Sequence, residues 1–238
     1  MQGPPPAKYD VMVESWRDLH PHWEIKTWTE EEMKPLAVGP WVNVLDQCTL
    51  LIQRADIYRM IVLERYGGVY IDCDMHTLKS LEPLVHETRI QIGGCHGSIS
   101  SAFIKVNNGI ILAPAAHPAW RTCVIPELLR AFSTSTILDA LVTIRVIRTT
   151  GPLVWGRIVT RSPQDFLVHP PNAFYSLRIK KREHVTDQVK QQLLGSYVYH
   201  AQDSSWLSGW ERGVMVGVMN IKWVICILTW ILFMYCVR

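Results

Sequence analysis

The sequence has little excess charge of either sign. Its 238 residues contain 24 lysines and arginines and 21 aspartates and glutamates, which leaves a formal net charge of +3. So small a charge does not indicate nucleic-acid binding, and we expect no nucleic-acid partner. Internal repeats and low-complexity tracts are also absent, which argues against a repeat architecture. The densest basic run, at 178–182, fits a solvated face, with contact to anionic lipid headgroups as the alternative.

Several common motifs are missing as well. The six cysteines are scattered without a C-x-x-C pair, so no zinc site is expected, and their spacing defines no disulfide framework. The glycines at 93–97 are not followed by Gly-Lys-Ser/Thr, which excludes a nucleoside-triphosphate P-loop. The opening MQGPPPAKYD holds no apolar signal segment, and we expect residues 1–10 to be extended or disordered.

What the chain does contain indicates a folded domain and a membrane segment. Apolar residues make up 48% of the chain and charged residues 19%, which excludes a disordered chain and allows a sizeable core, expected at 11–212. Residues 214–237 are almost wholly apolar and long enough to cross a bilayer, although Asn220 and Lys222 interrupt them. A single-pass transmembrane helix is predicted there, with a buried core helix as the alternative.

The stretch at 54–74, RADIYRMIVLERYGGVYIDCD, organises the rest of the chain. Its first part has the apolar spacing of a helix, on which Asp56 and Arg59 are three residues apart and share a face. Gly67 stands where a helix stop with positive φ is expected. The β-branched and aromatic residues at 69–72 then predict a strand.

Two acidic residues at the end of that strand are candidate metal ligands. Side chains alternate along a strand, so Asp72 and Asp74 point to the same side if the strand geometry persists that far. Neighbouring carboxylates repel each other unless a cation or donor groups lie between them. Oxygen ligands of this kind suit Mg²⁺ or Mn²⁺. An ordinary helix–turn–strand with a surface acidic pair is the simpler alternative.

The whole stretch resembles the DXD region of glycosyltransferase family 32, which includes fungal inositol-phosphoceramide mannosyltransferases. The shared pattern is A-D-x-x-R, a few apolar residues, then Y-G-G-x-Y-x-D-x-D. It is carried here by nine positions: Ala55, Asp56, Arg59, Tyr66, Gly67, Gly68, Tyr70, Asp72 and Asp74. A bare D-x-D is weak, but the nine-position pattern is specific.

A second segment, YVYHAQDSSW at 197–206, resembles the late histidine and Ser-Trp of the same family. The resemblance implies that His200 is a metal ligand or a diphosphate contact. It implies that Ser205 contacts metal or phosphate and that Trp206 donates its indole N–H to phosphate. Asp203 is a further candidate near the metal. Each of these residues alone is more often structural, and only their combination with the acidic pair favours a site.

Two further motifs carry the resemblance between these segments. Asn108, in a segment that resembles N-x-x-x-x-x-x-P-x-H-P, is implied to lie near the donor sugar. The Thr-Gly-Pro at 150–152 resembles a family element at the edge of the cleft, although a plain turn also explains it. The turn-forming residues at 107–109 predict a tight turn.

The remaining patterns give a coarse secondary structure. Thr29 and Glu32 predict a capping box at a helix start. Helices are predicted at 11–19, 120–132, 137–147 and 185–194, and strands at 23–28, 90–94, 103–106, 166–169 and 197–199.

The resemblance implies a GT-A fold, which is an α/β Rossmann-like, mostly parallel mixed sheet flanked by helices. The implied activity is retaining transfer of a hexose, mannose from GDP-mannose or a sugar from a UDP-sugar, to a lipid or glycan acceptor with Mn²⁺ or Mg²⁺. The implied location is the membrane of the Golgi or another endomembrane. The implied catalytic residues are Asp72 and Asp74, the metal ligands Asp74, Asp72 and His200, and the donor-binding residues Asp56, Arg59, Gly68, Tyr70, Asn108, Ser205 and Trp206.

The sequence departs from the family pattern at its start. Family members open with a strand of the type I-P-K-I-I-H-Q-x-W, whose end helps to hold the nucleotide, and no such segment is found here. A fragment, a late start codon and a strand supplied otherwise are the three explanations. Two other functions compete with sugar transfer: a catalytically inactive membrane-bound relative that acts as a binding partner, and a metal-dependent hydrolase that uses the acidic pair.

Overall fold

The computed structural model describes residues 7–95, 106–134, 136, 139, 141–175 and 195–201. The predicted transmembrane helix at 214–237, the predicted helix at 185–194, and Asp203, Ser205 and Trp206 all lie outside these residues. Within the described part of the chain, no helix combines the length and the apolar character needed to cross a membrane.

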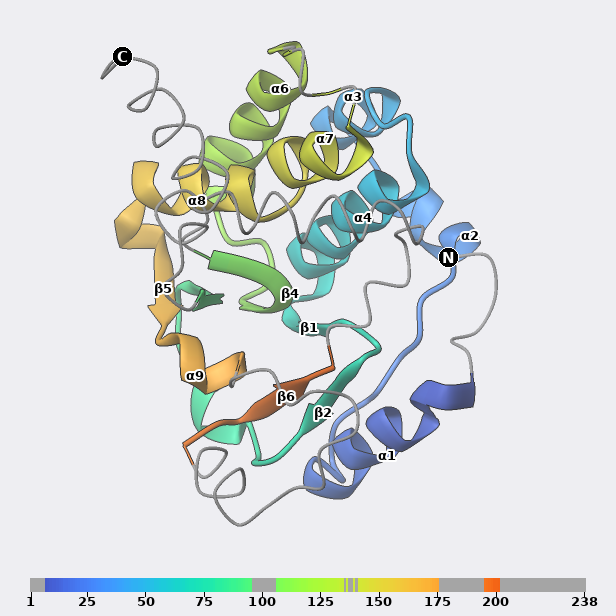
Figure 1. The fold of residues 1–238 in the computed structure, drawn as a ribbon, viewed down its shortest axis with the longest axis vertical. Helices are drawn as coiled ribbons and strands as arrows, with labels where there is room; N and C mark the ends of the chain where they lie inside the picture. The colour runs from blue at the N-terminus through green and yellow to red at the C-terminus, as the bar shows by residue number, and fades with distance from the viewer. Residues whose placement is uncertain are drawn as a thin grey trace, which may run out of the picture.

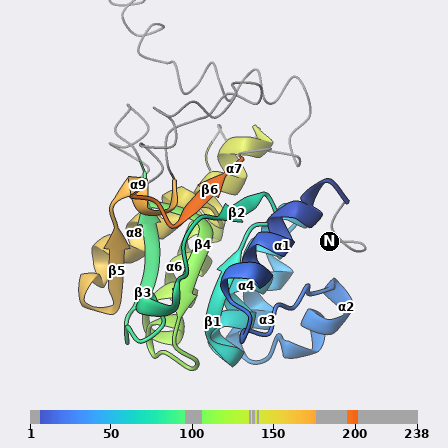
Figure 2. The same cartoon turned by 90° about the horizontal axis from the view of Figure 1, so that it is seen from below.

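A mixed four-stranded sheet forms the centre of the molecule, in the order β1-β4-β3-β5 (Figures 1 and 2). Its strands are β1 (Gly68–Ile71), β3 (Ile90–Gly94), β4 (Val106–Ala113) and β5 (Phe166–His169). β4 pairs antiparallel with both β1 and β3, and only β3 and β5 are parallel. The expected mixed α/β sheet is therefore confirmed, but these strands are not mostly parallel as we predicted.

A two-stranded ribbon lies beside the sheet. β2 (Met75–Thr77) pairs antiparallel with β6 (Val198–His200), and Met75 stands opposite His200. The indole nitrogen of Trp16 donates a hydrogen bond of 2.9 Å to the carbonyl of Met75, which ties the ribbon to α1 (Asp10–Leu19). Figure 1 shows α1, β2 and β6 together at one end of the molecule. The sequence predicted β6 but not its partner β2.

Helices cover the opposite side of the sheet (Figures 1 and 2). The helical segments within the described residues are η1 (Ala7–Tyr9), α1, α2 (Glu30–Met33), η2 (Lys34–Leu36), α3 (Pro40–Asp46), α4 (Leu51–Tyr66), η3 (Glu82–Leu84), η4 (Trp120–Val124), α6 (Ile125–Ser133), α7 (Val142–Thr149), α8 (Pro152–Arg161), η6 (Pro163–Asp165) and α9 (Pro171–Phe174). Of these, α3, α4, α6, α7 and α8 form the layer opposite α1 and the ribbon.

The central strand β4 separates two hydrophobic cores, because successive side chains of a strand point to opposite faces. Ile111 and Ala113 belong to the core beneath α3, α4, α6 and α8. Ile110 and Leu112 belong to the core formed with α1, β2, α9 and β6. The unbroken apolar run at the end of β4 thus serves both faces, as is typical of a strand covered on each side.

Local sequence signals set the ends of two helices as expected. The capping box is present, because the Glu32 amide donates to Thr29 Oγ1 at 3.3 Å and the Thr29 amide donates to Glu32 Oε2 at 2.9 Å. Gly67 follows α4 with φ +67°, and a Cβ on it would lie 2.5 Å from the Ala115 amide nitrogen. Both the backbone angle and the close approach require glycine at this helix end.

Other expectations were wrong. Residues 7–9, predicted to be extended or disordered, form η1. No strand forms at 23–28, where Trp28 stacks on Tyr66 instead of joining a sheet. The predicted turn at 107–109 lies inside β4, because contacts from other elements overrule the turn preference of Asn and Gly. A helix was predicted at 137–147, and the helix that the structure describes there, α7, begins at Val142 and ends at Thr149.

Candidate active site

The two aspartates of the D-x-D motif lie in a turn that follows β1. The strand ends at Ile71, and the Asp72 amide then donates to the Gly109 carbonyl at 2.8 Å while the Met75 amide donates to the Asp72 carbonyl at 3.1 Å. The alternation on which the prediction depended therefore stops before Asp74. The two carboxylates nevertheless come together with the imidazole of His200, and one ligand atom from each residue lies within 4.8 Å of the others.

His200 is the last residue of β6, and the pairing of β6 with β2 brings it next to the two aspartates. The Ala201 amide donates to the Asp74 carbonyl at 3.0 Å, and His200 Nε2 lies 3.2 Å from Asp74 Oδ1. The other ring nitrogen, Nδ1, is buried and has no hydrogen-bond partner among the described residues. A buried polar atom of this kind needs a partner beyond the described residues, such as water, an ion or another part of the chain. Two carboxylates and an imidazole form a donor set that fits a divalent cation such as Mn²⁺.

Asp72 is held in one orientation by two donors. Tyr70 donates its hydroxyl to Asp72 Oδ1 at 2.8 Å, and Arg59 Nη1 lies 3.2 Å from the same oxygen. The Arg59 guanidinium also lies over the Tyr70 ring, 4.4 Å from its centroid. Burial raises the pKa of Tyr70 well above its usual value, so the hydroxyl keeps its proton and remains a donor.

Behind Asp72, a buried network centres on Asp56. Arg59 Nη2 lies 2.8 Å from Asp56 Oδ1, and the side-chain nitrogen Nδ2 of Asn108 donates to that oxygen at 3.2 Å. The Thr150 hydroxyl donates to Asp56 Oδ2 at 2.7 Å. Arg59 Nη1 donates to the Asn108 carbonyl at 2.7 Å as well. Asp56 is 4% exposed and Arg59 6%. Arg59 therefore bridges the buried Asp56 and the more exposed Asp72.

Burial raises the pKa of Asp56 to about 6, against the lowering effect of Arg59. The unfolded chain releases this proton near pH 3.8, so the folded state binds more protons between about pH 4 and 6. The stability contributed by this group therefore falls as the pH rises through that window. Denaturant unfolding of Asp56→Asn and of the parent at pH 4 and 7 measures this effect. We expect the variant to gain stability relative to the parent as the pH rises, and a constant difference would contradict the raised pKa.

The predicted site residues thus divide into three groups. Asp56, Arg59, Tyr70, Asp72, Asp74, Asn108 and His200 form one connected cluster. Gly68 starts β1, at the end of the strand away from Asp72, where its φ of +89° favours glycine. Ser205 and Trp206 lie outside the described residues.

Sequence reasoning placed Thr150 only at a cleft edge and did not single out Gly109. Thr150 is fully buried and bonds directly to Asp56. A Cβ on Gly109 would lie 2.9 Å from Met75 Cε and 3.0 Å from Asp72 Oδ2, so a larger residue there would have to displace these two side-chain ends. The Thr-Gly-Pro motif was a usable signal for Thr150, whereas the Asn-Asn-Gly run indicated a turn.

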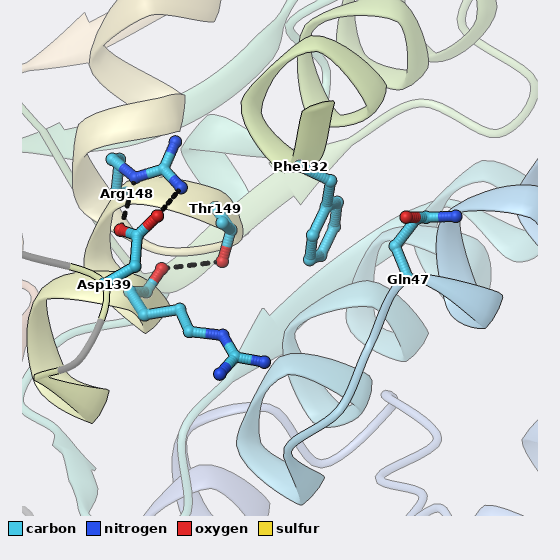
Figure 3. A pocket seen from close by; sticks show the side chains of 6 residues that line it. Gln47, Phe132, Asp139, Arg148 and Thr149 are labelled. Carbon is cyan, nitrogen blue, oxygen red and sulfur yellow. Dashed lines mark hydrogen bonds and ion pairs between the residues drawn. The ribbon is translucent and has the colours of Figure 1, made fainter. Parts of the chain in front are cut away.

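A separate hollow lies between α3, α6 and α7, away from this cluster (Figure 3). Its lining includes Phe132, Arg148 and Thr149. Arg148 is neutralised by a two-point ion pair with Asp139, through Nε at 2.8 Å and Nη2 at 2.5 Å. None of the predicted site residues lines this hollow, and its geometry adds nothing to the metal-ligating cluster.

Comparison with known proteins gives a partial match. Residues 6–91 match the family described as "Glycosyltransferase sugar-binding region containing DXD motif". Inositol phosphoceramide mannosyltransferase 3 of Schizosaccharomyces pombe is 37% identical over 84 residues, which are 34% of this chain and 24% of that protein. Mannosyl phosphorylinositol ceramide synthase SUR1 of Saccharomyces cerevisiae is 37% identical over 88 residues, 33% of this chain and 23% of that protein.

A longer but weaker match extends beyond this region. Mannosyl phosphorylinositol ceramide synthase CSH1 of Saccharomyces cerevisiae is 23% identical over 201 residues, which are 76% of this chain and 50% of that protein. Among solved structures, the PaToxG glycosyltransferase aligns with a TM-score of 0.35 and 19% identity, over 56% of this chain and 44% of that one. The chain spans between about a quarter and a half of the length of these curated relatives.

The matched region ends with β3 and includes the α4 helix, β1 and both aspartates of the cluster. The family 32 resemblance read from the nine-position pattern is thereby confirmed. Over residues 6–91 this chain is similar to the glycosyltransferase sugar-binding regions that contain a DXD motif.

Proposed function

We propose that this chain is a metal-dependent, retaining glycosyltransferase that moves a hexose from a nucleotide sugar to an acceptor. The convergence of Asp72, Asp74 and His200, from segments far apart in the sequence, is the observation that carries the proposal. It occurs at the D-x-D motif of the matched sugar-binding region, where a diphosphate would be held. Neither the acidic pair nor the histidine would be persuasive alone.

The chemistry follows from where charge develops. Cleavage at the anomeric carbon leaves negative charge on the leaving diphosphate, and a bound divalent cation neutralises that charge as a Lewis acid. Asp74 and His200 would hold the cation. Asp72, oriented by Tyr70 and Arg59, would complete its ligand set or accept hydrogen bonds from the sugar or ribose hydroxyls.

The remaining proposed donor contacts surround this centre. Arg59 is proposed to face the donor sugar and phosphate, with Asp56 holding its guanidinium in place. The Asn108 side chain donates to Asp56, and its backbone carbonyl accepts from Arg59. The other proposed donor-binding residues are Gly68, Tyr70, Ser205 and Trp206. No carboxylate is placed as a covalent nucleophile, and a departure and attack on the same face of the sugar accounts for retention.

For the substrates we propose mannose from GDP-mannose as the donor, with a UDP-sugar as the alternative, and Mn²⁺ or Mg²⁺ as the cation. The proposed acceptor is a lipid of the inositol phosphoceramide type or a glycan. The choice of mannose and of the lipid acceptor is supported by the names of the matched fungal relatives, which refer to inositol phosphoceramide or its mannosylated form. A membrane location, in the Golgi or another endomembrane, is proposed with them.

The test is a panel of nucleotide sugars incubated with the full chain, with and without Mn²⁺. We expect Mn²⁺-dependent binding of GDP-mannose, slow hydrolysis without acceptor, and faster release of GDP when inositol phosphoceramide is added. Tight nucleotide binding without turnover on any acceptor would instead support an inactive binding partner. Release of free sugar at a rate that lipid does not change would support a hydrolase.

A second prediction concerns the domain boundaries. If 11–212 is the catalytic domain and 214–237 a membrane helix, a chain cut after Trp210 loses its anchor and stays in solution, while the full chain sediments with membranes. The measurement is sedimentation after a carbonate wash. Membrane association of the truncated chain that survives this wash would refute the anchor at 214–237.

A further inference from the structure

We propose that Tyr175 is a positioning residue for the metal ligands, through a bulge of β4 that its hydroxyl keeps open. The inference rests on the proposed function, because it takes the Asp72–Asp74–His200 cluster to bind a divalent cation. Nothing in the sequence pattern or in the family match, which ends at residue 91, assigns a role to this tyrosine.

The bulge lies where β4 passes the acidic pair. The adjacent β3 residues Ile92 and Gly93 pair with Ile111 and Asn107, so residues 108–110 of β4 have no partner on β3. Bulges of this kind redirect a strand locally and are enriched beside active sites. The Asn107 side chain supports it, because its Oδ1 accepts a hydrogen bond of 3.0 Å from the Gly109 amide.

The backbone carbonyls of the bulged residues accept hydrogen bonds from two residues of the candidate site. The Gly109 carbonyl accepts the Asp72 amide at 2.8 Å, and the Asn108 carbonyl accepts Arg59 Nη1 at 2.7 Å. The backbone of Asp72 and the guanidinium that orients its carboxylate are therefore both anchored to the bulge.

Tyr175 bonds to backbone groups at both ends of the bulge. Its hydroxyl donates to the Asn107 carbonyl and accepts from the Ile110 amide, both at 3.1 Å. The side chain is 4% exposed, and burial raises the pKa of the hydroxyl well above its usual value, so it remains a donor. Without the hydroxyl, the buried Ile110 amide and the partly buried Asn107 carbonyl would each lose a hydrogen-bond partner, which destabilises the bulge.

The ring of Tyr175 contacts both strand β3 and the imidazole of His200. It lies against Gly93, where a Cβ would be only 2.4 Å from Tyr175 Cε2, so glycine at this strand position makes room for it. The ring also meets the His200 imidazole edge-on, with centroids 5.7 Å apart. One side chain thus contacts the bulge that anchors Asp72 and the ring of the histidine opposite.

The experiment measures Mn²⁺ binding by the full chain without nucleotide, by titration calorimetry, for the parent and Tyr175→Phe. The variant keeps the ring and loses only the hydroxyl, and we expect its Kd for Mn²⁺ to rise by about 10- to 100-fold. Hydrogen exchange at the Ile110 amide should also become faster. The matched control is Tyr58→Phe, which removes a hydroxyl from a tyrosine that is 2% exposed and whose partner at 3.0 Å, Arg54, is not a member of the cluster. We expect a stability loss in the control with no change in Kd.

The outcomes separate this inference from the proposed function. If the parent binds neither Mn²⁺ nor Mg²⁺, the metal-dependent function fails and the inference fails with it. If the parent binds Mn²⁺ and Tyr175→Phe binds it equally well, only the inference is overturned. Should Tyr175→Phe not fold, Gly93→Ala keeps the hydroxyl but displaces the ring, and an unchanged Mn²⁺ affinity in that folded variant would equally overturn it.

Discussion

Replacing Asp74 by Asn should abolish metal-dependent donor binding while leaving the fold intact. The substitution removes the negative charge beside His200 Nε2, 3.2 Å away, and one of the two carboxylates of the cluster. Losing a direct ligand should cost at least as much as losing a group behind it, so we expect the Kd for Mn²⁺ to rise by more than about 100-fold. Transfer should fall by about 100- to 1,000-fold or more, because charge on the leaving diphosphate is no longer neutralised.

The fold should survive this change because the Asp74 backbone carries its structural role. Its carbonyl accepts the Ala201 amide at 3.0 Å, a bond that an Asn side chain leaves in place. The control is Asp165→Asn, which makes the same change of charge in η6, outside the metal-ligating cluster. Mn²⁺-stimulated transfer that persists undiminished in Asp74→Asn would remove the residue from the site.

Replacing Arg59 by Leu should produce the largest loss of stability among these variants. Asp56 would remain buried without the cation that lies 2.8 Å from its carboxylate, and removing one partner of a buried pair costs about 3–5 kcal/mol. Asp72 would lose one of its two orienting donors in the same step. We expect a lower free energy of unfolding in urea and a weaker Mn²⁺ affinity together.

A double-mutant cycle separates the two effects. Adding Asp56→Asn to Arg59→Leu removes the unpaired charge, so the unfolding free energy should largely recover. The Mn²⁺ affinity should stay weak, because Asp72 still lacks its arginine. Arg54→Leu is the matched control on the same helix as Arg59, since its ion pair with Glu30 of α2 joins side chains that are 30% and 29% exposed and should contribute about 1 kcal/mol or less. Equal losses from Arg54→Leu and Arg59→Leu would contradict the bridging role.

Local sequence signals were sufficient for much of the scaffold. The apolar spacing at 54–66, the glycine that follows it and the β-branched residues after that correctly predicted α4 and β1 with the acidic pair at the strand end. The Thr29–Glu32 capping box, β3 and β5 were also recognised in advance. These features depend on residues that are neighbours in the chain, so short-range propensity and capping determine them.

The site itself required the tertiary structure. His200 reaches Asp74 only because β6 pairs with the unpredicted β2, and the two strands are far apart in the sequence. The Asn-Asn-Gly run predicted a turn, but it lies in β4 as a bulge, where its backbone carbonyls accept hydrogen bonds from Tyr175, Arg59 and the Asp72 amide. By itself, then, the sequence determined which residues carry charge and where the helix and strand beneath them end. The fold decided which of those residues meet, because strand pairing and buried hydrogen bonds join positions that no local pattern connects.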